Sequence, residues 1–114
     1  MTLKNGAAAE QLAATWLQRQ GLKLLTANYH CRFGEIDLVM RDGKQTVFVE
    51  VRLRSHGAFG GAAASITPAK QQKLIRAAEH YLMQHGLTSC RFDAVLLDEL
   101  STDSIVWLKN AFDG

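Results

Sequence analysis

Hydrophobic positions change their spacing several times along the chain, and each spacing predicts one kind of element. From residue 7 to residue 20 apolar side chains recur at helical intervals and Gly21 follows as a stop signal, so we predict an amphipathic helix. Residues 22–30 lack this periodicity and precede the break at Gly34, and we predict a short strand there.

The clearest pattern is a row of apolar side chains at every second position in two neighbouring segments. Residues 34–42 and 45–54 each place apolar side chains at every second position, which is typical of strands. Asp42-Gly43 lies between them and is a strong turn signal. We therefore predict a β-hairpin with this dipeptide at its tip.

This turn predicts which residues face each other across the hairpin. Ile36 pairs with Val49 in the predicted register, and one face of the ribbon is apolar and is expected to lie against a helix. Glu35 lies opposite Glu50 on the other face, which is predicted to be polar. Asp37 lies diagonal to Glu50 in the same row.

The second half of the chain contains another helix signal followed by two strand signals. Residues 55–66 are rich in glycine and alanine and predict a loop. Thr67-Pro68 predicts the start of a helix that stops at Gly86. The strands predicted after it span 90–100 and 104–112, with a polar turn at 101–103. The predicted order of elements is therefore αβββαββ.

Length and composition indicate one ordinary globular domain. The chain has 114 residues, of which 47% are hydrophobic and 21% charged, so we expect residues 1–114 to form a single domain with its own core. The net charge of +2 is too small to identify an anionic partner. We predict a cytoplasmic protein without a membrane span, because no export signal and no long apolar run is present. Cys31 and Cys90 are then expected to be free thiols.

The polar face of the hairpin carries the most informative group of charges. Asp37 and Glu50 lie close together there, and Arg52 and Arg54 continue the same row. Like charges on neighbouring strands destabilise a sheet unless a cation compensates them, and carboxylate oxygens suit Mg²⁺. The alternative from spacing alone is a solvated face whose acidic side chains form ion pairs with the two arginines.

Several sequence blocks along nearly the whole chain resemble a known family. The blocks are GEIDLV at 34–39, VFVEVR at 47–52, KQQKLI at 70–75 and CRFDAV at 90–95, preceded by a helix that carries Glu10. In this order they resemble the bacterial YraN family. That family is identified as a member of the PD-(D/E)XK superfamily and is similar to archaeal Holliday-junction resolvases. The resemblance implies a restriction-endonuclease-like αβββαβ core, with a mixed central sheet and flanking helices.

The resemblance also implies a function and a set of site residues. The function is a Mg²⁺- or Mn²⁺-dependent DNA endonuclease of the kind that acts in repair and recombination. Asp37 and Glu50 take the positions of its metal ligands, and Glu10 that of a third ligand. Arg52 stands where the superfamily motif has lysine, and it is expected to stabilise charge because a guanidinium cannot act as a base. Lys70 or Lys73 from the second helix is a candidate source of the missing ammonium group.

Basic residues on the second predicted helix indicate where a nucleic acid would bind. Lys70, Lys73 and Arg76 fall on one arc of this helix, and with Arg54 they form the predicted phosphate-contacting set. An ordinary solvated helix face gives the same pattern. The implied partner is DNA, including branched DNA, and the resolvase likeness predicts a symmetric homodimer.

Two other functions remain open from the sequence. The arginine at position 52 is compatible with a nucleic-acid-binding module that keeps the nuclease fold without turnover. The hairpin charges are also compatible with a protein-interaction scaffold in which they only form ion pairs.

Overall fold

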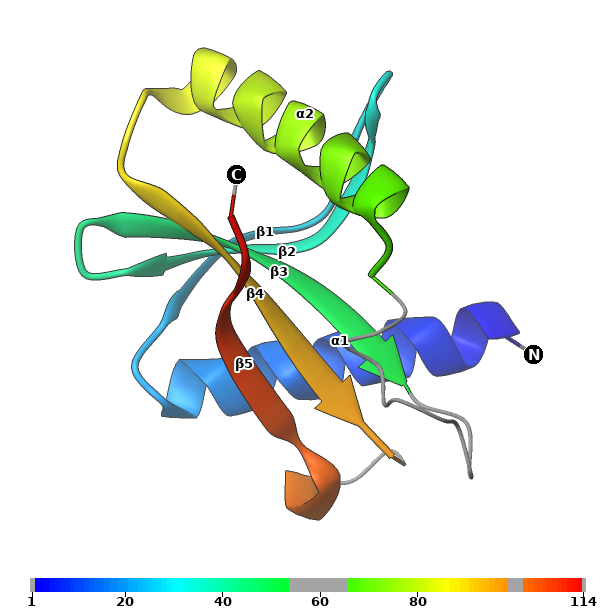
Figure 1. Ribbon diagram of the computed structural model, residues 1–114. Helices are drawn as coiled ribbons and strands as arrows, with labels where there is room; N and C mark the ends of the chain where they lie inside the picture. The colour runs from blue at the N-terminus through cyan, green and yellow to red at the C-terminus, as the bar shows by residue number, and fades with distance from the viewer. Residues whose placement is uncertain (1, 54–65, 99–101, 114) are drawn as a thin grey trace.

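The computed structural model describes residues 2–53, 66–98 and 102–113 (Figure 1). Its elements follow the predicted αβββαββ order along the described chain, with a short 3₁₀ helix, η2, before the last strand. Their bounds are α1 Thr2–Arg19, β1 Lys23–Cys31, β2 Gly34–Asp42, β3 Gln45–Leu53, α2 Pro68–His85, β4 Cys90–Leu97, η2 Thr102–Ser104 and β5 Val106–Phe112.

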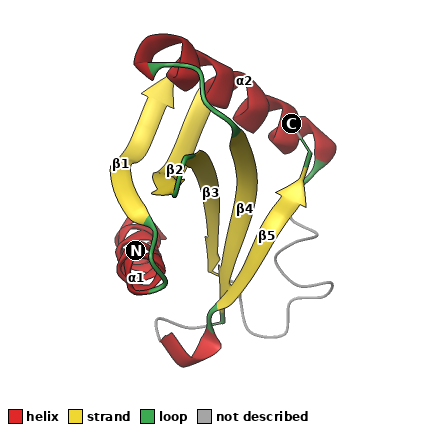
Figure 2. Cartoon of the chain, turned by 90° about the vertical axis from the view of Figure 1, so that its left-hand side faces the viewer, coloured by secondary structure: helices red, strands yellow, loops and turns green. Residues whose placement is uncertain are grey.

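The described strands form one mixed sheet in the order β1-β2-β3-β4-β5. Neighbouring strands are antiparallel except β3 and β4, which are parallel and are connected through α2. The sheet lies between the two helices, with α1 and α2 on opposite faces (Figure 2). This arrangement confirms the predicted α/β class with a mixed central sheet and flanking helices.

The ends of α2 follow from the predicted capping residues. The hydroxyl of Thr67 accepts a hydrogen bond of 3.2 Å from the backbone N–H of Lys70, and Pro68 occupies the first turn, where its missing N–H has no cost. Gly86 adopts a φ of 109° beyond the last turn, a conformation that side chains disfavour. The helix α1 is longer than predicted at its start, since it begins at Thr2 and ends at Arg19.

Each face of the sheet buries its own apolar cluster. Phe48 and Val39 pack beneath α2, with Tyr81 from the helix itself. Val47 and Val49 pack on the other face against α1. The prediction that one face of the hairpin is polar is therefore wrong for most of its length, because central strands with a helix on each side are buried on both faces. The polar row is confined to the end of the strands.

The register of the hairpin differs from the prediction by two residues. Val49 pairs with Leu38 rather than with Ile36, and Asp42 pairs with Gln45. The turn is therefore Gly43-Lys44, and Gly43 supplies the positive φ of 61° that this tight connection requires. A shift of two residues keeps every side chain on its face but changes its neighbours.

Some predicted boundaries also change. The strand predicted for 90–100 ends at Leu97, and the strand predicted for 104–112 begins at Val106. Ile66, predicted in a loop, is 5% exposed and belongs to the core beneath α2. The remainder of that loop and Arg54 lie outside the described residues. Of the helices that the structure describes, neither combines the length and the apolar character needed to cross a membrane.

Candidate functional site

The candidate site lies where β2 and β3 stop pairing. Their ladder ends at the pair Leu38 and Val49, and beyond it the N–H of Val51 donates a hydrogen bond of 2.9 Å to Oδ2 of Asp37. The alternation of β2 also breaks at this point, because Leu38 packs on the α1 side whereas Ile36 packs on the α2 side. Asp37 thus sits in a fork between the strands, where a backbone donor fixes its carboxylate.

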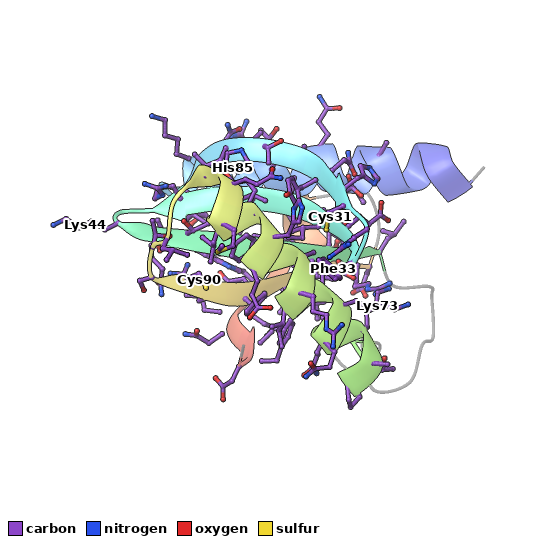
Figure 3. The ribbon with its side chains drawn as sticks, turned by 90° about the horizontal axis from the view of Figure 1, so that it is seen from above. Cys31, Phe33, Lys44, Lys73, His85 and Cys90 are labelled. Atoms are coloured by element: carbon purple, nitrogen blue, oxygen red, sulfur yellow. The ribbon has the colours of Figure 1, made fainter. Side chains whose placement is uncertain are left out.

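Four elements meet around this fork and enclose a cavity of about 320 Å³. Continuation of the observed register places Asp37 across from Glu50, rather than diagonal to it as predicted. Glu50 is 6% exposed and its carboxylate faces the cavity from β3. Lys73 lines the cavity from the first half of α2 (Figure 3). The charged residues that line the cavity are Glu10 from α1, Glu35 and Asp37 from β2, Glu50 and Arg52 from β3, and Lys70 and Lys73 from α2.

Three of these carboxylates interact strongly, and we refer to Glu10, Asp37 and Glu50 as the carboxylate trio. Burial, followed by the charge of Asp37 and a hydrogen bond with it, raises the pKa of Glu10 to about 7. Burial, a hydrogen bond with Asp37 and its charge raise the pKa of Glu50 to about 8. At neutral pH the trio therefore either keeps a proton or needs a bound cation to balance its negative charge.

Two cations already approach Glu50. Nη2 of Arg52 lies 2.7 Å from its Oε2, and Nζ of Lys70 lies 3.7 Å from the same oxygen. These charges lower the pKa of Glu50, but burial and Asp37 have the larger effect. Within the described part of the chain, Nε and Nη2 of Arg52 are buried without a hydrogen-bond partner, so the close contact with Glu50 lacks hydrogen-bond geometry.

The donor set of the trio fits Mg²⁺ or Mn²⁺. These are hard cations that prefer carboxylate oxygen, and Mg²⁺ typically takes one or two protein carboxylates and keeps several waters. No three His, Cys, Asp or Glu side chains in the described ranges are already arranged as a metal cluster. The fit is therefore to an ion held by Asp37 and Glu50 together with water, with Glu10 beside them, and not to a complete protein cage.

The structure brings together most of the predicted site residues. Glu10, Asp37, Glu50 and Arg52 line one cavity. Lys70 and Lys73, the predicted substitutes for the missing ammonium group, line the same cavity from α2.

Two other residues singled out in the sequence do not join this group, and a third, Glu35, lines the cavity only at its rim. Arg76 lines a separate hollow farther along α2. Glu35 is exposed at the rim and pairs with Nδ1 of His30 at 3.2 Å instead of facing Glu50 across the hairpin. Arg54 lies beyond the described end of β3.

Asn28 is a site residue that the sequence analysis missed. Its side chain forms a hydrogen bond with Glu10, which lowers the pKa of that carboxyl against the larger effect of burial. Asn28 also adopts a φ of 53° within β1. Asparagine tolerates this conformation better than most residues and is disfavoured in strands, so an asparagine inside a predicted strand was the available signal.

A second buried carboxylate lies apart from the cavity. Asp93 is fully buried and accepts hydrogen bonds from Nε of Arg91, from Nε1 of Trp107 and from the backbone N–H of Asn110. These contacts connect β4 to β5.

Comparisons with known proteins agree with the sequence blocks. The profile described as "Uncharacterised protein family UPF0102" matches residues 9–97. A UPF0102 protein of Methylobacillus flagellatus is 59% identical over 107 residues, which cover 94% of this chain and 95% of the relative. A UPF0102 protein of Nitrosomonas europaea is 61% identical over 109 residues, covering 95% and 92%. One from Legionella pneumophila is 52% identical over 116 residues, covering 99% and 98%. This chain therefore belongs to the UPF0102 family, the YraN family that its sequence blocks resemble.

Proposed function

We propose that this protein is a Mg²⁺- or Mn²⁺-dependent nuclease that hydrolyses phosphodiester bonds in DNA. One observation carries the proposal: Glu10, Asp37 and Glu50 line one cavity at the strand fork, and the same cavity also contains cations. Burial and the neighbouring Asp37 raise the pKa of Glu10 to about 7 and that of Glu50 to about 8, even though Arg52 and Lys70 approach Glu50. Such a group is typical of a site that binds a cation.

Each residue of the cavity has a role in this proposal. A bound divalent ion supplies positive charge for phosphoryl oxygens and lowers the pKa of water. Asp37 and Glu50 hold the ion, and the Val51 N–H keeps the Asp37 carboxylate oriented. Arg52 places a positive charge beside Glu50 at 2.7 Å, and Lys70 contributes a second positive charge near the same carboxylate.

The basic residues of α2 favour an anionic polymer as the substrate. Lys70 and Lys73 line the cavity, so a phosphate that enters it from the α2 side meets positive charge before it reaches the trio. Phosphate contacts of this kind hold a strand without reading its sequence. We therefore propose DNA, including branched DNA, as the substrate, with a homodimer as the active form on a two-fold symmetric junction.

The substitution Asp37→Asn tests the proposal. Asparagine can still accept the hydrogen bond from the Val51 N–H, so the fork should persist while the charge is lost. We expect wild-type protein with Mn²⁺ or Mg²⁺ to cleave duplex, flap or four-way DNA, and Asp37→Asn to lose about 100-fold or more of this activity. Asp113→Asn removes an exposed carboxylate elsewhere and should cleave normally. Cleavage by Asp37→Asn at the wild-type rate would refute the proposal.

The contact between Arg52 and Glu50 favours a second candidate function. A guanidinium held 2.7 Å from Glu50 competes with a metal ion for that carboxylate, which suits a DNA-binding module without turnover. The substitution Arg52→Lys separates the two functions. If the wild type binds DNA with strong salt dependence but cleaves none, and Arg52→Lys gains cleavage, the non-catalytic function holds. Wild-type cleavage that Arg52→Lys does not increase would exclude it.

A further inference from the structure

We call the cavity that contains the carboxylate trio the carboxylate cavity. A second hollow lies beside it and is lined by aromatic, basic and apolar side chains with one acidic residue. It is open, has a volume of about 480 Å³ and lies between the β1–β2 turn and the outer side of α2. We call it the aromatic hollow, after its two rings. Its lining residues are Phe33, Arg76, Glu79, His80 and Met83.

The aromatic hollow and the carboxylate cavity adjoin at one contact. Gly34, the residue after Phe33, lines the carboxylate cavity, and a Cβ built on it would lie 3.7 Å from Cβ of Lys73. Lys73 also lines that cavity. Phe33 and Lys73 lie close together in the view from above α2 (Figure 3). A strand of nucleic acid that leaves the carboxylate cavity past Lys73 would therefore reach Phe33 next.

The rings of the hollow are held in place by their neighbours. Phe33 meets His80 edge to face, with 6.2 Å between the ring centroids. The hydroxyl of Tyr29 lies 2.5 Å from Nδ1 of His80 and fixes the orientation of that ring. The guanidinium of Arg32 lies over one face of the Phe33 ring, 4.8 Å from its centroid, so a stacked base would use the other face. A partly exposed phenyl ring fixed in this way is a suitable platform for a flat aromatic ligand.

Charge around the hollow favours a ligand that also carries phosphate. Arg32 and Arg76 are exposed on its two sides, Lys73 stands toward the carboxylate cavity, and Glu79 is the acidic residue of the lining. Met83 is 77% exposed and provides an adaptable apolar surface. Aromatic faces combined with cations along a backbone path are the features of sites that bind single-stranded nucleic acid.

We propose that an unpaired base of the DNA strand whose phosphate occupies the carboxylate cavity stacks on Phe33 in the aromatic hollow. This inference rests on the proposed nuclease function, and it defines the substrate as DNA with unpaired bases beside the cleaved bond. Arg76 contacts the backbone of the same strand. A fully paired duplex keeps its bases stacked inside the helix and cannot use the platform without the cost of unpairing.

Binding without metal tests the inference separately from cleavage. Fluorescence anisotropy in EDTA would compare wild type, Phe33→Ala, Phe33→Leu and Phe33→Trp on a flap DNA and on the matched paired duplex. We expect Phe33→Ala and Phe33→Leu to weaken flap binding about 5- to 150-fold and to leave duplex binding nearly unchanged. Phe33→Trp keeps an aromatic ring and should bind the flap DNA like the wild type. Leu87→Ala changes another exposed apolar residue, 78% exposed beyond α2, and should bind both DNAs like the wild type.

A spectroscopic signal then locates the base. A 2-aminopurine placed in the flap beside the junction should change its fluorescence on binding to the wild type and to Phe33→Trp, but not on binding to Phe33→Leu. Equal flap binding by wild type and Phe33→Ala, or equal loss on flap and duplex, would overturn the stacking site even if the protein cleaves DNA. If the wild type cleaves nothing but Phe33→Leu selectively loses flap binding, the nuclease function fails and the stacking site stands.

Discussion

Replacement of Glu50 by glutamine is expected to stabilise the metal-free protein at alkaline pH. Burial, hydrogen bonding with Asp37 and its charge raise the pKa of Glu50 from 4.5 to about 8 in the folded chain. Below the lower value both the folded and the unfolded chain hold the proton. Between the two values the unfolded chain has released the proton that the folded chain still holds, so the free energy of unfolding falls as pH rises. Above about 8 both forms are ionised and this loss is complete.

The size of the effect follows from the difference between the two pKa values. At about 1.4 kcal/mol per pKa unit, a rise from 4.5 to about 8 corresponds to at most about 5 kcal/mol. Glu50 shares this interaction with Asp37, so we expect a gain on the order of 2 kcal/mol for Glu50→Gln at about pH 8.5. The attraction of Arg52 and Lys70 for the ionised form is already included in this pKa.

Urea denaturation in EDTA, followed by tryptophan fluorescence, measures this gain. Wild type, Glu50→Gln and the exposed-site control Asp113→Asn would be compared at about pH 5 and about pH 8.5, since differences between variants remove the titration of all other groups. We expect the advantage of Glu50→Gln to grow with pH. In a parallel series without EDTA, Mg²⁺ at 100 times its Kd should stabilise the wild type by about 2.7 kcal/mol and leave the stability of Glu50→Gln nearly unchanged. An advantage equal at both pH values, or a less stable Glu50→Gln at alkaline pH, would refute this reasoning.

Substitutions at three other positions test how the fold supports the site. Asp93→Asn removes the buried carboxylate from Arg91, which keeps its ion pair with Asp42 at 3.0 Å, and should cost about 1–3 kcal/mol in urea denaturation; wild-type stability would contradict a charged network. Asn28→Ala removes the hydrogen bond to Glu10, should raise the pKa of Glu10 further, and should weaken Mn²⁺ binding in calorimetry. Asn28→Gly, which accepts the φ of 53°, should bind Mn²⁺ equally weakly, and unchanged affinity in both would exclude the role. Gly34→Ala should cost about 1–3 kcal/mol because of its φ of 147°, and an unchanged urea midpoint would contradict this.

Local signals in the sequence were sufficient to predict the elements and their order. Period-two alternation predicted β2 and β3, and Thr67, Pro68 and Gly86 predicted both ends of α2. These signals depend on residues close in sequence, such as a capping hydroxyl and the N–H three residues later. Tertiary packing changes them little.

The register and the burial of the second face could not be predicted from the same signals. Asp42-Gly43 and Gly43-Lys44 both place glycine in a tight turn, and the two registers give each side chain the same face. Only packing against a helix on each side of the sheet distinguishes them. Because Phe48 and Val39 stand in the same rows as charged residues, the sequence does not show that α2 covers them.

The candidate site was predicted in part by strand parity and in part by resemblance. Alternation alone placed Asp37 and Glu50 on one face, and the observed register brings them closer than predicted. Glu10 reaches them from α1, at a long distance in sequence, so periodicity carries no signal for it. Its position was predicted only by the family resemblance. The Asn28 contact depends on an unusual backbone conformation inside a strand and was missed.

The two cations at Glu50 differ in the chemistry that they can provide. Arg52 comes from the same strand as Glu50 and lies 2.7 Å from its carboxylate, and a guanidinium group offers only hydrogen-bond donors. Lys70 comes from α2, and its ammonium lies 3.7 Å from the same oxygen. The motif of the resembled superfamily has lysine at the position of Arg52, but in this fold α2 brings lysine to the carboxylate from the other side of the cavity. A lysine on the strand is therefore not required for an ammonium group to reach Glu50. Under the proposed function, Arg52 on β3 balances the charge of Glu50, and Lys70 on α2 supplies the ammonium group.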